Sequence, residues 1–236
     1  MIHGETGGGK AEIIVALDES SLDDARRLMD QLAGRVGFYK IGLQLFTAAG
    51  MAAVEAVQAH GARVFLDLKL HDIPNTVSSA VRAARESNVD LCTIHLSGGA
   101  EMCAAAVEAA GDRMKILGVT VLTSSTESTL EDCGVCGSVG EQVVRLAKLG
   151  HAAGVGGFVA SALELRLLRA ELGTKPLFVI PGVRPSGADA GDQKRIATPA
   201  DAVRGGATHL VIGRPISRAA NPSEALEAIA SEIARA

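Results

Sequence analysis

The chain repeats one pattern along its length: a short apolar run followed by a longer amphipathic stretch. Short runs that are apolar on both faces are typical of parallel strands covered by helices. Eight such units follow one another in 236 residues without a linker. This predicts an α/β protein with a single (β/α)8 TIM barrel, whereas an open doubly wound sheet would normally use about five to seven strands. The expected strands are Ile13–Asp18, Phe38–Gly42, Val64–Leu70, Leu91–Leu96, Ile116–Thr123, Gly157–Ser161, Leu177–Gly182 and Leu210–Arg214.

Residues 1–10 precede the first expected strand and contain a misleading motif. Gly4 to Lys10 has the G-x-x-x-x-G-K spacing of a nucleotide-triphosphate loop. That loop needs a hydroxyl after the lysine and must follow a strand, but position 11 is Ala and the first strand comes later. We therefore expect a flexible tail over 1–10 and a barrel domain over 11–236. The clearest helices are expected at Ser21–Ala33, Pro74–Ala84 and Glu224–Ile233.

The composition argues against several classes of function. The formal net charge is −4, and with no Trp and one Tyr neither a basic nucleic-acid surface nor an aromatic stacking platform is expected. No uncharged apolar run approaches the roughly 18 residues that cross a membrane, and no secretory signal pattern is present. We expect a cytoplasmic protein that binds neither nucleic acid nor membrane.

The pair Cys133 and Cys136 has the C-x-x-C spacing of redox and zinc sites. Zinc would need a second pair of ligands at similar spacing, which the sequence lacks, and a redox pair would normally open a helix directly after a strand. The two cysteines instead fall in a glycine-rich loop, so we interpret them as small loop residues.

The densest chemical feature is the segment 64–76, with Asp67, Lys69 and Asp72. Side chains two apart in a strand share a face, so Asp67 and Lys69 should point into the barrel while the leucines between them meet the helices. Charges there are costly unless paired, and the carboxyl end of a barrel strand is where catalytic groups lie. The alternative is a buried ion pair that only fixes register, but buried pairs are poor stabilisers.

Two further strands add charges to the same mouth. Asp18 ends the first expected strand and Lys40 lies in the second. Lys40, Asp67, Lys69 and Asp72 would then alternate in sign, so that each ion favours the charged form of its neighbour. An ammonium held protonated beside a fixed anion suits the protonation of a carbanion.

An anion site is expected after the seventh and eighth strands, where barrels often hold phosphate. Gly182 and Gly213 allow close approach of an anion to the backbone, and Arg184 and Arg214 supply charge. Gln193 lies in the long loop that follows the seventh strand, which is a candidate lid, as is the long stretch between Thr123 and the sixth strand.

The ten residues Asp67–Thr76 (D-L-K-L-H-D-I-P-N-T) closely resemble the signature of the orotidine 5′-phosphate decarboxylase family. The similarity runs through the whole chain in order. Its other blocks are 16–18, Tyr39–Gly42, Thr93–His95, Val119–Ser124, Pro181–Pro185, Asp192–Arg195 and Ile212–Ile216.

This resemblance implies a homodimeric barrel, with neither cofactor nor metal, that converts orotidine 5′-phosphate to UMP and CO2 in pyrimidine biosynthesis. It implies that Lys69 donates a proton to C6 beside Asp67. It further implies that Asp72 and Thr76 reach the partner subunit's site. Asp18 and Lys40 would bind the ribose, and Thr123 and Ser124 would contact the pyrimidine. The phosphate would be held by Arg184, Gln193, Gly213 and Arg214.

The chain departs from the family pattern in two places. The segment 154–161 lacks the Asp and Cys expected around the sixth strand, and Cys133 replaces an aliphatic residue.

Two other functions stay open. One is a metal-dependent sugar-phosphate lyase of the same superfamily, of the hexulose-6-phosphate synthase or ketogulonate-phosphate decarboxylase type. The other is a non-catalytic phosphate-binding module. The lyases resemble the chain less at the second strand, where they carry a glutamate suited to magnesium instead of Lys40.

Overall fold

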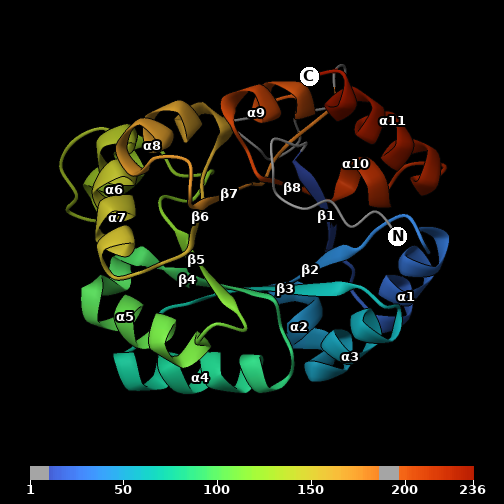
Figure 1. Ribbon diagram of the computed structural model, residues 1–236, viewed down its shortest axis with the longest axis horizontal. Coiled ribbons are helices and arrows are strands. Elements are labelled where there is room, and N and C mark those ends of the chain that lie inside the picture. The colour runs from blue at the N-terminus through green and yellow to red at the C-terminus, as the bar shows by residue number, and fades with distance from the viewer. Residues whose placement is uncertain (1–10, 186–196) are drawn as a thin grey trace.

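The computed structural model describes residues 11–185 and 197–236, whose strands form a closed parallel barrel (Figure 1). Each strand pairs with the next in the sequence, and β8 pairs with β1. The predicted (β/α)8 barrel is therefore confirmed. The expected tail over 1–10 lies outside the described residues. The strands are β1 (Glu12–Leu17), β2 (Phe38–Gly42), β3 (Arg63–Leu70), β4 (Leu91–His95), β5 (Lys115–Val119), β6 (Gly157–Val159), β7 (Leu177–Ile180) and β8 (His209–Ile212).

Helices surround the strands, as Figure 1 shows, and their ends follow local sequence signals. Ser21 caps α1 by accepting a hydrogen bond from the Asp24 backbone, and Pro74 opens α4, where its missing N–H costs nothing. The helices are α1 (Leu22–Gln31), α2 (Leu43–Ala49), α3 (Met51–Ala59), α4 (Pro74–Glu86), α5 (Gly99–Ala110), α6 (Glu127–Asp132), α7 (Val139–Ala152), α8 (Leu165–Leu172), α9 (Pro199–Gly205), α10 (Arg214–Ser217) and α11 (Pro222–Ala234), with 3-10 turns η1 (Leu96–Gly98) and η2 (Ala162–Glu164).

Alternate side chains of the strands build two apolar layers. The larger layer lies between the strands and the helices and includes Leu66, Ile94 and Phe158. The smaller layer fills the barrel interior, where Phe38 and Phe65 are almost completely buried. Because apolar side chains fill the interior, an open cavity is expected only at the ends of the strands.

Several strands end earlier than the sequence predicts. The expected fifth strand reached Thr123, but β5 ends at Val119. Thr120 is buried and donates its hydroxyl to the carbonyl of Val159 at 3.2 Å, while Val121 is buried outside the strand. Apolar residues that line a cavity and apolar residues of a strand look alike in the sequence, so the pattern predicts too long a strand.

The long segment between β5 and β6 contains α6 and α7. A Schellman motif ends α6: Gly134 has φ +76°, and Val135 donates its backbone N–H to the carbonyl of Leu130 at 2.9 Å. Cys133 and Cys136 lie in this turn, exposed and free. Their interpretation as loop residues agrees with the structure, and no cluster of three metal-ligating side chains exists among the described residues.

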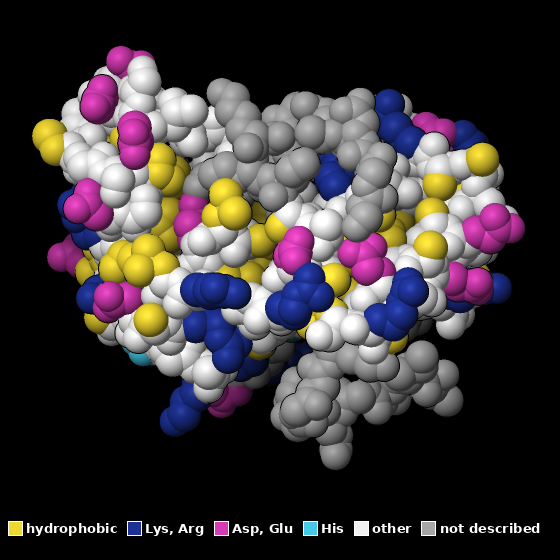
Figure 2. All heavy atoms as spheres, turned by 90° about the horizontal axis from the view of Figure 1, so that it is seen from above, with side chains coloured by type: hydrophobic (Ala, Val, Ile, Leu, Met, Phe, Trp, Pro, Cys, Tyr) yellow, Lys and Arg dark blue, Asp and Glu magenta, His cyan; other side chains and the backbone are white. Residues whose placement is uncertain are grey.

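The outer face of the helices carries charges of both signs. Figure 2 views the side of the barrel formed by α8, α9 and α11, where Lys and Arg side chains lie interspersed with Asp and Glu. Arg204 and Asp201 of α9, for example, form an ion pair of 2.6 Å. None of the helices in the described part of the chain is long and apolar enough to cross a membrane.

Candidate active site

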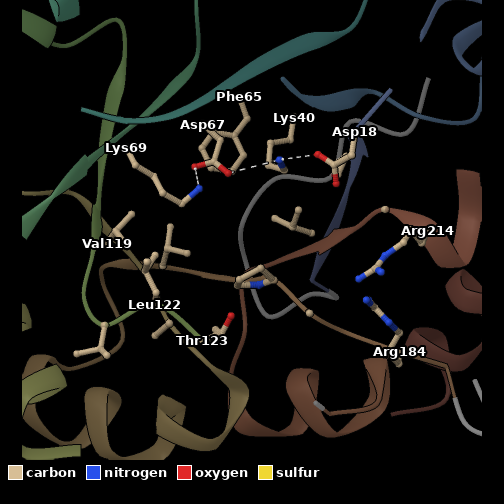
Figure 3. A pocket seen from close by; sticks show the side chains of 18 residues that line it. Asp18, Lys40, Phe65, Asp67, Lys69, Val119, Leu122, Thr123, Arg184 and Arg214 are labelled. Carbon is tan, nitrogen blue, oxygen red and sulfur yellow. Dashed lines mark hydrogen bonds and ion pairs between the residues drawn. The ribbon is translucent and has the colours of Figure 1, made fainter. Parts of the chain in front are cut away.

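A cavity of about 240 Å³ opens at the carboxyl ends of the strands (Figure 3). This volume is close to the lower end of the usual range for small-molecule sites, about 300 Å³. One end is lined by Asp18, which follows β1, and by charged side chains of β2 and β3. The other end is lined by Arg184 and Arg214, which follow β7 and β8. The lining residues are Ala16, Asp18, Lys40, Phe65, Asp67, Lys69, Val119, Val121, Leu122, Thr123, Val159, Ala160, Pro181, Gly182, Arg184, Val211, Gly213 and Arg214.

The end of β3 is irregular, and this irregularity positions the catalytic candidates. Leu66 pairs with Cys92 and Leu70 pairs with Ile94, so β3 advances by four residues where β4 advances by two. Lys69 lies in the resulting bulge with φ +51°, a left-handed conformation that costs a non-glycine residue roughly 1–2 kcal/mol. Bulges of this kind re-aim a side chain beside a site.

Four side chains of alternating sign form a continuous chain across the mouth. Lys69 Nζ lies 2.8 Å from Asp67 Oδ1, and Lys40 Nζ lies 3.4 Å from Asp67 Oδ2. Lys40 also contacts Asp18 Oδ1 at 3.2 Å. Figure 3 shows this order, Asp18–Lys40–Asp67–Lys69, as one row above the cavity. We call these four residues the charge array.

Gly42 makes room for the array, a role that nothing in the sequence indicates. A Cβ at this position would lie 2.9 Å from Lys40 Nζ and 3.4 Å from Asp18 Oδ1. The position therefore tolerates no side chain unless the ammonium moves away from Asp18.

The array keeps Asp67 ionised despite its burial. Burial alone would raise the pKa of this carboxyl, but the charges of Lys40 and Lys69 and hydrogen bonds from Lys69 and Thr93 lower it below its ordinary value. An anion with two cationic neighbours and a hydroxyl donor is fixed in place. The array therefore holds one carboxylate and one flanking ammonium toward the cavity.

The pKa of Asp67 is lower in the folded state than in the unfolded state. The Asp67 carboxylate therefore stabilises the fold fully at pH values above the unfolded pKa of about 3.9, and this stabilisation is lost as the pH falls through the folded pKa. Asp67→Asn is expected to lower the free energy of unfolding at pH 7 by on the order of 2 kcal/mol, less than a fully buried pair because Lys69 is 28% exposed. Urea unfolding of both proteins from pH 7 to 2.5 should show this difference shrinking below about pH 4. A constant difference would contradict the assignment.

The other end of the cavity carries two guanidinium groups. Figure 3 shows Arg184 and Arg214 extending toward each other from the segments after β7 and β8. Arg184 is 8% exposed and donates to the carbonyl of Val183 at 3.0 Å. Gly213 lies against Asp18, where a Cβ would be 3.2 Å from its carboxylate. The planar guanidinium groups of Arg184 and Arg214 suit the binding of a phosphate or a carboxylate.

The structure brings most of the predicted site residues together, but not all. Thr123 lines the cavity, whereas Ser124 is exposed and does not. Asp72 and Thr76 are exposed at the rim, and neither lines the cavity of its own chain. Gln193 lies outside the described residues.

Three residues near the charges were not singled out from the sequence. Phe65 forms the apolar floor beside Asp67, and Leu122, 41% exposed, overhangs the cavity. Thr93 of β4 is buried under the charges and bonds to Asp67. The alternation of inward- and outward-pointing side chains along β3 would have identified Phe65. The positions of Leu122 and Thr93 depend on contacts between strands and loops that the sequence does not show.

Comparisons with known proteins agree with this geometry. The sequence model of the orotidine 5′-phosphate decarboxylase / HUMPS family matches residues 11–229. The chain belongs to this family. A relative from Trichlorobacter lovleyi, named orotidine 5′-phosphate decarboxylase, is 51% identical over 95% of each chain, and one of the same name from Anaeromyxobacter sp. is 50% identical over 93% of this chain and 96% of its own.

Solved structures place the fold in the same family. The crystal structure of orotidine 5′-phosphate decarboxylase from Lactobacillus acidophilus superimposes with a TM-score of 0.84 at 35% identity, covering 94% of this chain and 99% of that one. An uncharacterised conserved protein from Geobacillus kaustophilus superimposes with a TM-score of 0.82 at 33% identity and the same coverage. The resemblance inferred from the signature Asp67–Thr76 is thus confirmed at the level of the family.

Proposed function

We propose that this protein is a carboxy-lyase that converts orotidine 5′-phosphate to UMP and CO2 in pyrimidine biosynthesis. Its relatives at about 50% identity carry the name of this activity and not that of the alternative sugar-phosphate lyase. The observation that carries the proposal is the charge array at the mouth of a barrel of this family: it offers an ammonium beside a fixed anion.

In the proposed reaction the bond between C6 and the carboxylate carbon breaks, and its electron pair stays on C6 as CO2 leaves. The Lys69 ammonium stabilises this developing charge, because the cation stands ready before the reaction and needs no reorganisation. One Nζ–H bond then breaks as the C6–H bond forms, and Lys69 regains its proton from solvent. Asp67 holds the ammonium at 2.8 Å and disfavours a second negative charge in the ground state.

The remaining residues anchor the substrate. We assign Asp18 and Lys40 to the ribose hydroxyls and Thr123, with Ser124, to the pyrimidine. Arg184, Gly213 and Arg214 bind the phosphate, and Gln193 joins them from the loop after β7. The separation of Arg184 and Arg214 from Lys69 across the cavity supports this order, since a nucleotide places its phosphate and its base at opposite ends.

We further propose a homodimer in which each site borrows Asp72 and Thr76 from the partner. Both residues are exposed at the rim and neither lines the cavity of its own chain. Ile73, beside Asp72, is 65% exposed, and Leu43, the first residue of α2, is 57% exposed. Large apolar side chains at the rim are typical of a surface that a partner covers.

We also propose that the protein is cytoplasmic, a compartment in which thiols such as that of Cys133 stay reduced.

The proposed activity is tested by incubating the purified protein with orotidine 5′-phosphate and quantifying UMP and CO2. Equal amounts of both products are expected, together with no aldol product from ribulose 5-phosphate and formaldehyde. The Asp67→Asn variant serves as the inactive control, because it breaks the array without emptying the phosphate end. Turnover of the sugar phosphates in place of orotidine 5′-phosphate would favour the lyase alternative.

Arg214→Ala is expected to lower kcat/KM roughly 10- to 100-fold, the value of one charge-assisted hydrogen bond to phosphate. Much of the loss should be a higher KM, with kcat also reduced if phosphate binding helps to assemble the site. The control is Arg218→Ala, which removes an exposed guanidinium from the residue directly after α10 and should leave the kinetics unchanged. Unchanged kinetics for Arg214→Ala at low and saturating substrate would place the phosphate elsewhere.

A further inference from the structure

Beneath the charge array lies one buried hydroxyl that contacts both catalytic candidates of β3. Thr93, in the middle of β4, is completely buried. Its hydroxyl donates to Asp67 Oδ1 at 3.0 Å and accepts the backbone N–H of Lys69 at 2.9 Å. A hydroxyl has only one proton to donate, so the bond to Asp67 uses its whole donor capacity.

The bond from Lys69 occurs where the strand pairing is interrupted. Between the pairs Leu66–Cys92 and Leu70–Ile94, β3 and β4 lose their register. A backbone N–H buried without a partner is costly, and the hydroxyl of Thr93 supplies the partner that the β4 backbone does not. The same bond holds Lys69 at φ +51°, the left-handed conformation that a lysine adopts only when its surroundings enforce it.

The bond to Asp67 fixes the carboxylate from the side opposite the cavity. Asp67 Oδ1 accepts from both the Thr93 hydroxyl and Lys69 Nζ, while Oδ2 faces Lys40. Rotation of the carboxylate would break the bond to Thr93, so the oxygen that meets the Lys69 ammonium stays in one place. One side chain therefore positions the backbone of the proton donor and its anionic partner together.

We propose that Thr93 is a positioning residue for proton transfer: its hydroxyl links the Lys69 backbone to the Asp67 carboxylate and so sets the place of the Lys69 ammonium. Thr93 does not line the cavity, so we expect it to make no contact with the substrate. Its effect should appear in the chemical step, since a displacement of about 1 Å at a reacting group can cost about 100-fold in rate.

The kinetic test compares Thr93→Val, which keeps the shape and removes the hydroxyl, with Thr93→Ser, which keeps the hydroxyl. Thr93→Val is expected to lower kcat about 10- to 100-fold with little change in KM, and Thr93→Ser to retain most of the wild-type kcat. The matched control is Thr208→Val at the opposite end of the barrel. The Thr208 hydroxyl likewise accepts a hydrogen bond from a backbone N–H and donates one to a backbone carbonyl, and both groups belong to Phe178.

A loss of folding would lower the activity of Thr93→Val and Thr208→Val alike, so only a selective loss of kcat in the former supports the proposal. A kcat within twofold of wild type for Thr93→Val, or equal losses in the Val and Ser variants, would overturn it. Because this inference rests on the proposed function, a second readout is independent of activity: the hydrogen exchange of the Lys69 amide measured by NMR.

In the wild type and in Thr93→Ser, the Lys69 amide is expected to be protected, because its partner is a buried hydroxyl. In Thr93→Val its exchange should accelerate at least about tenfold, while amides of β7 keep their protection. Unchanged exchange would overturn the proposal even if the enzyme is active. Accelerated exchange in a protein without activity on orotidine 5′-phosphate would support the positioning of Lys69 and reject the proposed reaction.

Discussion

Lys69→Ala is expected to lower kcat at least about 1,000-fold while KM changes by less than about threefold. The ammonium matters mostly as negative charge develops on C6, and one such interaction is worth on the order of 3 kcal/mol. Loss of the proton source adds to this cost. Steady-state kinetics at saturating orotidine 5′-phosphate, with UMP affinity measured by calorimetry, separate the chemical step from binding.

The control for this change is Lys148→Ala. Lys148 of α7 forms an ion pair with Glu171 at 2.6 Å, and both side chains are exposed. Neither residue lines the cavity. Removal of Lys148 deletes the same charge and a comparable salt bridge without touching the array. If Lys69→Ala retains kcat within about tenfold, Lys69 is not the donor.

Mixing Lys69→Ala with Asp72→Ala protein is expected to restore about a quarter of the wild-type activity after subunits exchange. Each parent should be inactive, because every site of the proposed homodimer then lacks one essential charge. In a mixed dimer one site collects both lesions and the other has none. Random exchange makes about half of the dimers mixed, each with one intact site of two. Native mass spectrometry establishes the exchange, and the decarboxylation assay measures the recovery.

The matched control mixes Lys69→Ala with Asp67→Ala protein. Lys69 and Asp67 contact each other within one chain, so both sites of a mixed dimer carry a lesion and no activity should return. If exchange is complete and the Lys69→Ala and Asp72→Ala mixture also stays inactive, Asp72 acts within its own chain and the shared site is wrong.

The parts of the fold that depend on local pattern were predictable. Eight apolar runs indicated the barrel and the order of its strands, and alternation in β3 placed Asp67 and Lys69 toward the cavity and Leu66, Leu68 and Leu70 toward the helices. Strand ends were less predictable. Val121 and Leu122 are apolar because they border the cavity, and this pattern cannot be distinguished from a continued strand.

The details of the site that depend on pairing between strands were not predictable. The left-handed Lys69 and the register shift between β3 and β4 follow from how two strands meet, which no single segment encodes. Thr93 and Gly42 fall within the family blocks Thr93–His95 and Tyr39–Gly42, but for the same reason the sequence assigned neither of them a role. Thr93 is buried beneath the charges, and Gly42 matters because a Cβ there would lie 2.9 Å from Lys40 Nζ. Likewise, the exposure of Asp72 at the rim became visible only in three dimensions.

The claim that the charge array works without a metal is tested most directly by chelation. The carboxylates of Asp18 and Asp67 already contact the Lys40 ammonium, so a divalent cation between them would meet a fixed positive charge. The measurement is kcat on orotidine 5′-phosphate after exhaustive dialysis against EDTA, with residual metal determined by mass spectrometry and a magnesium-dependent enzyme treated in parallel. Unchanged kcat in metal-free protein is the expected result; loss of activity that magnesium restores would contradict it.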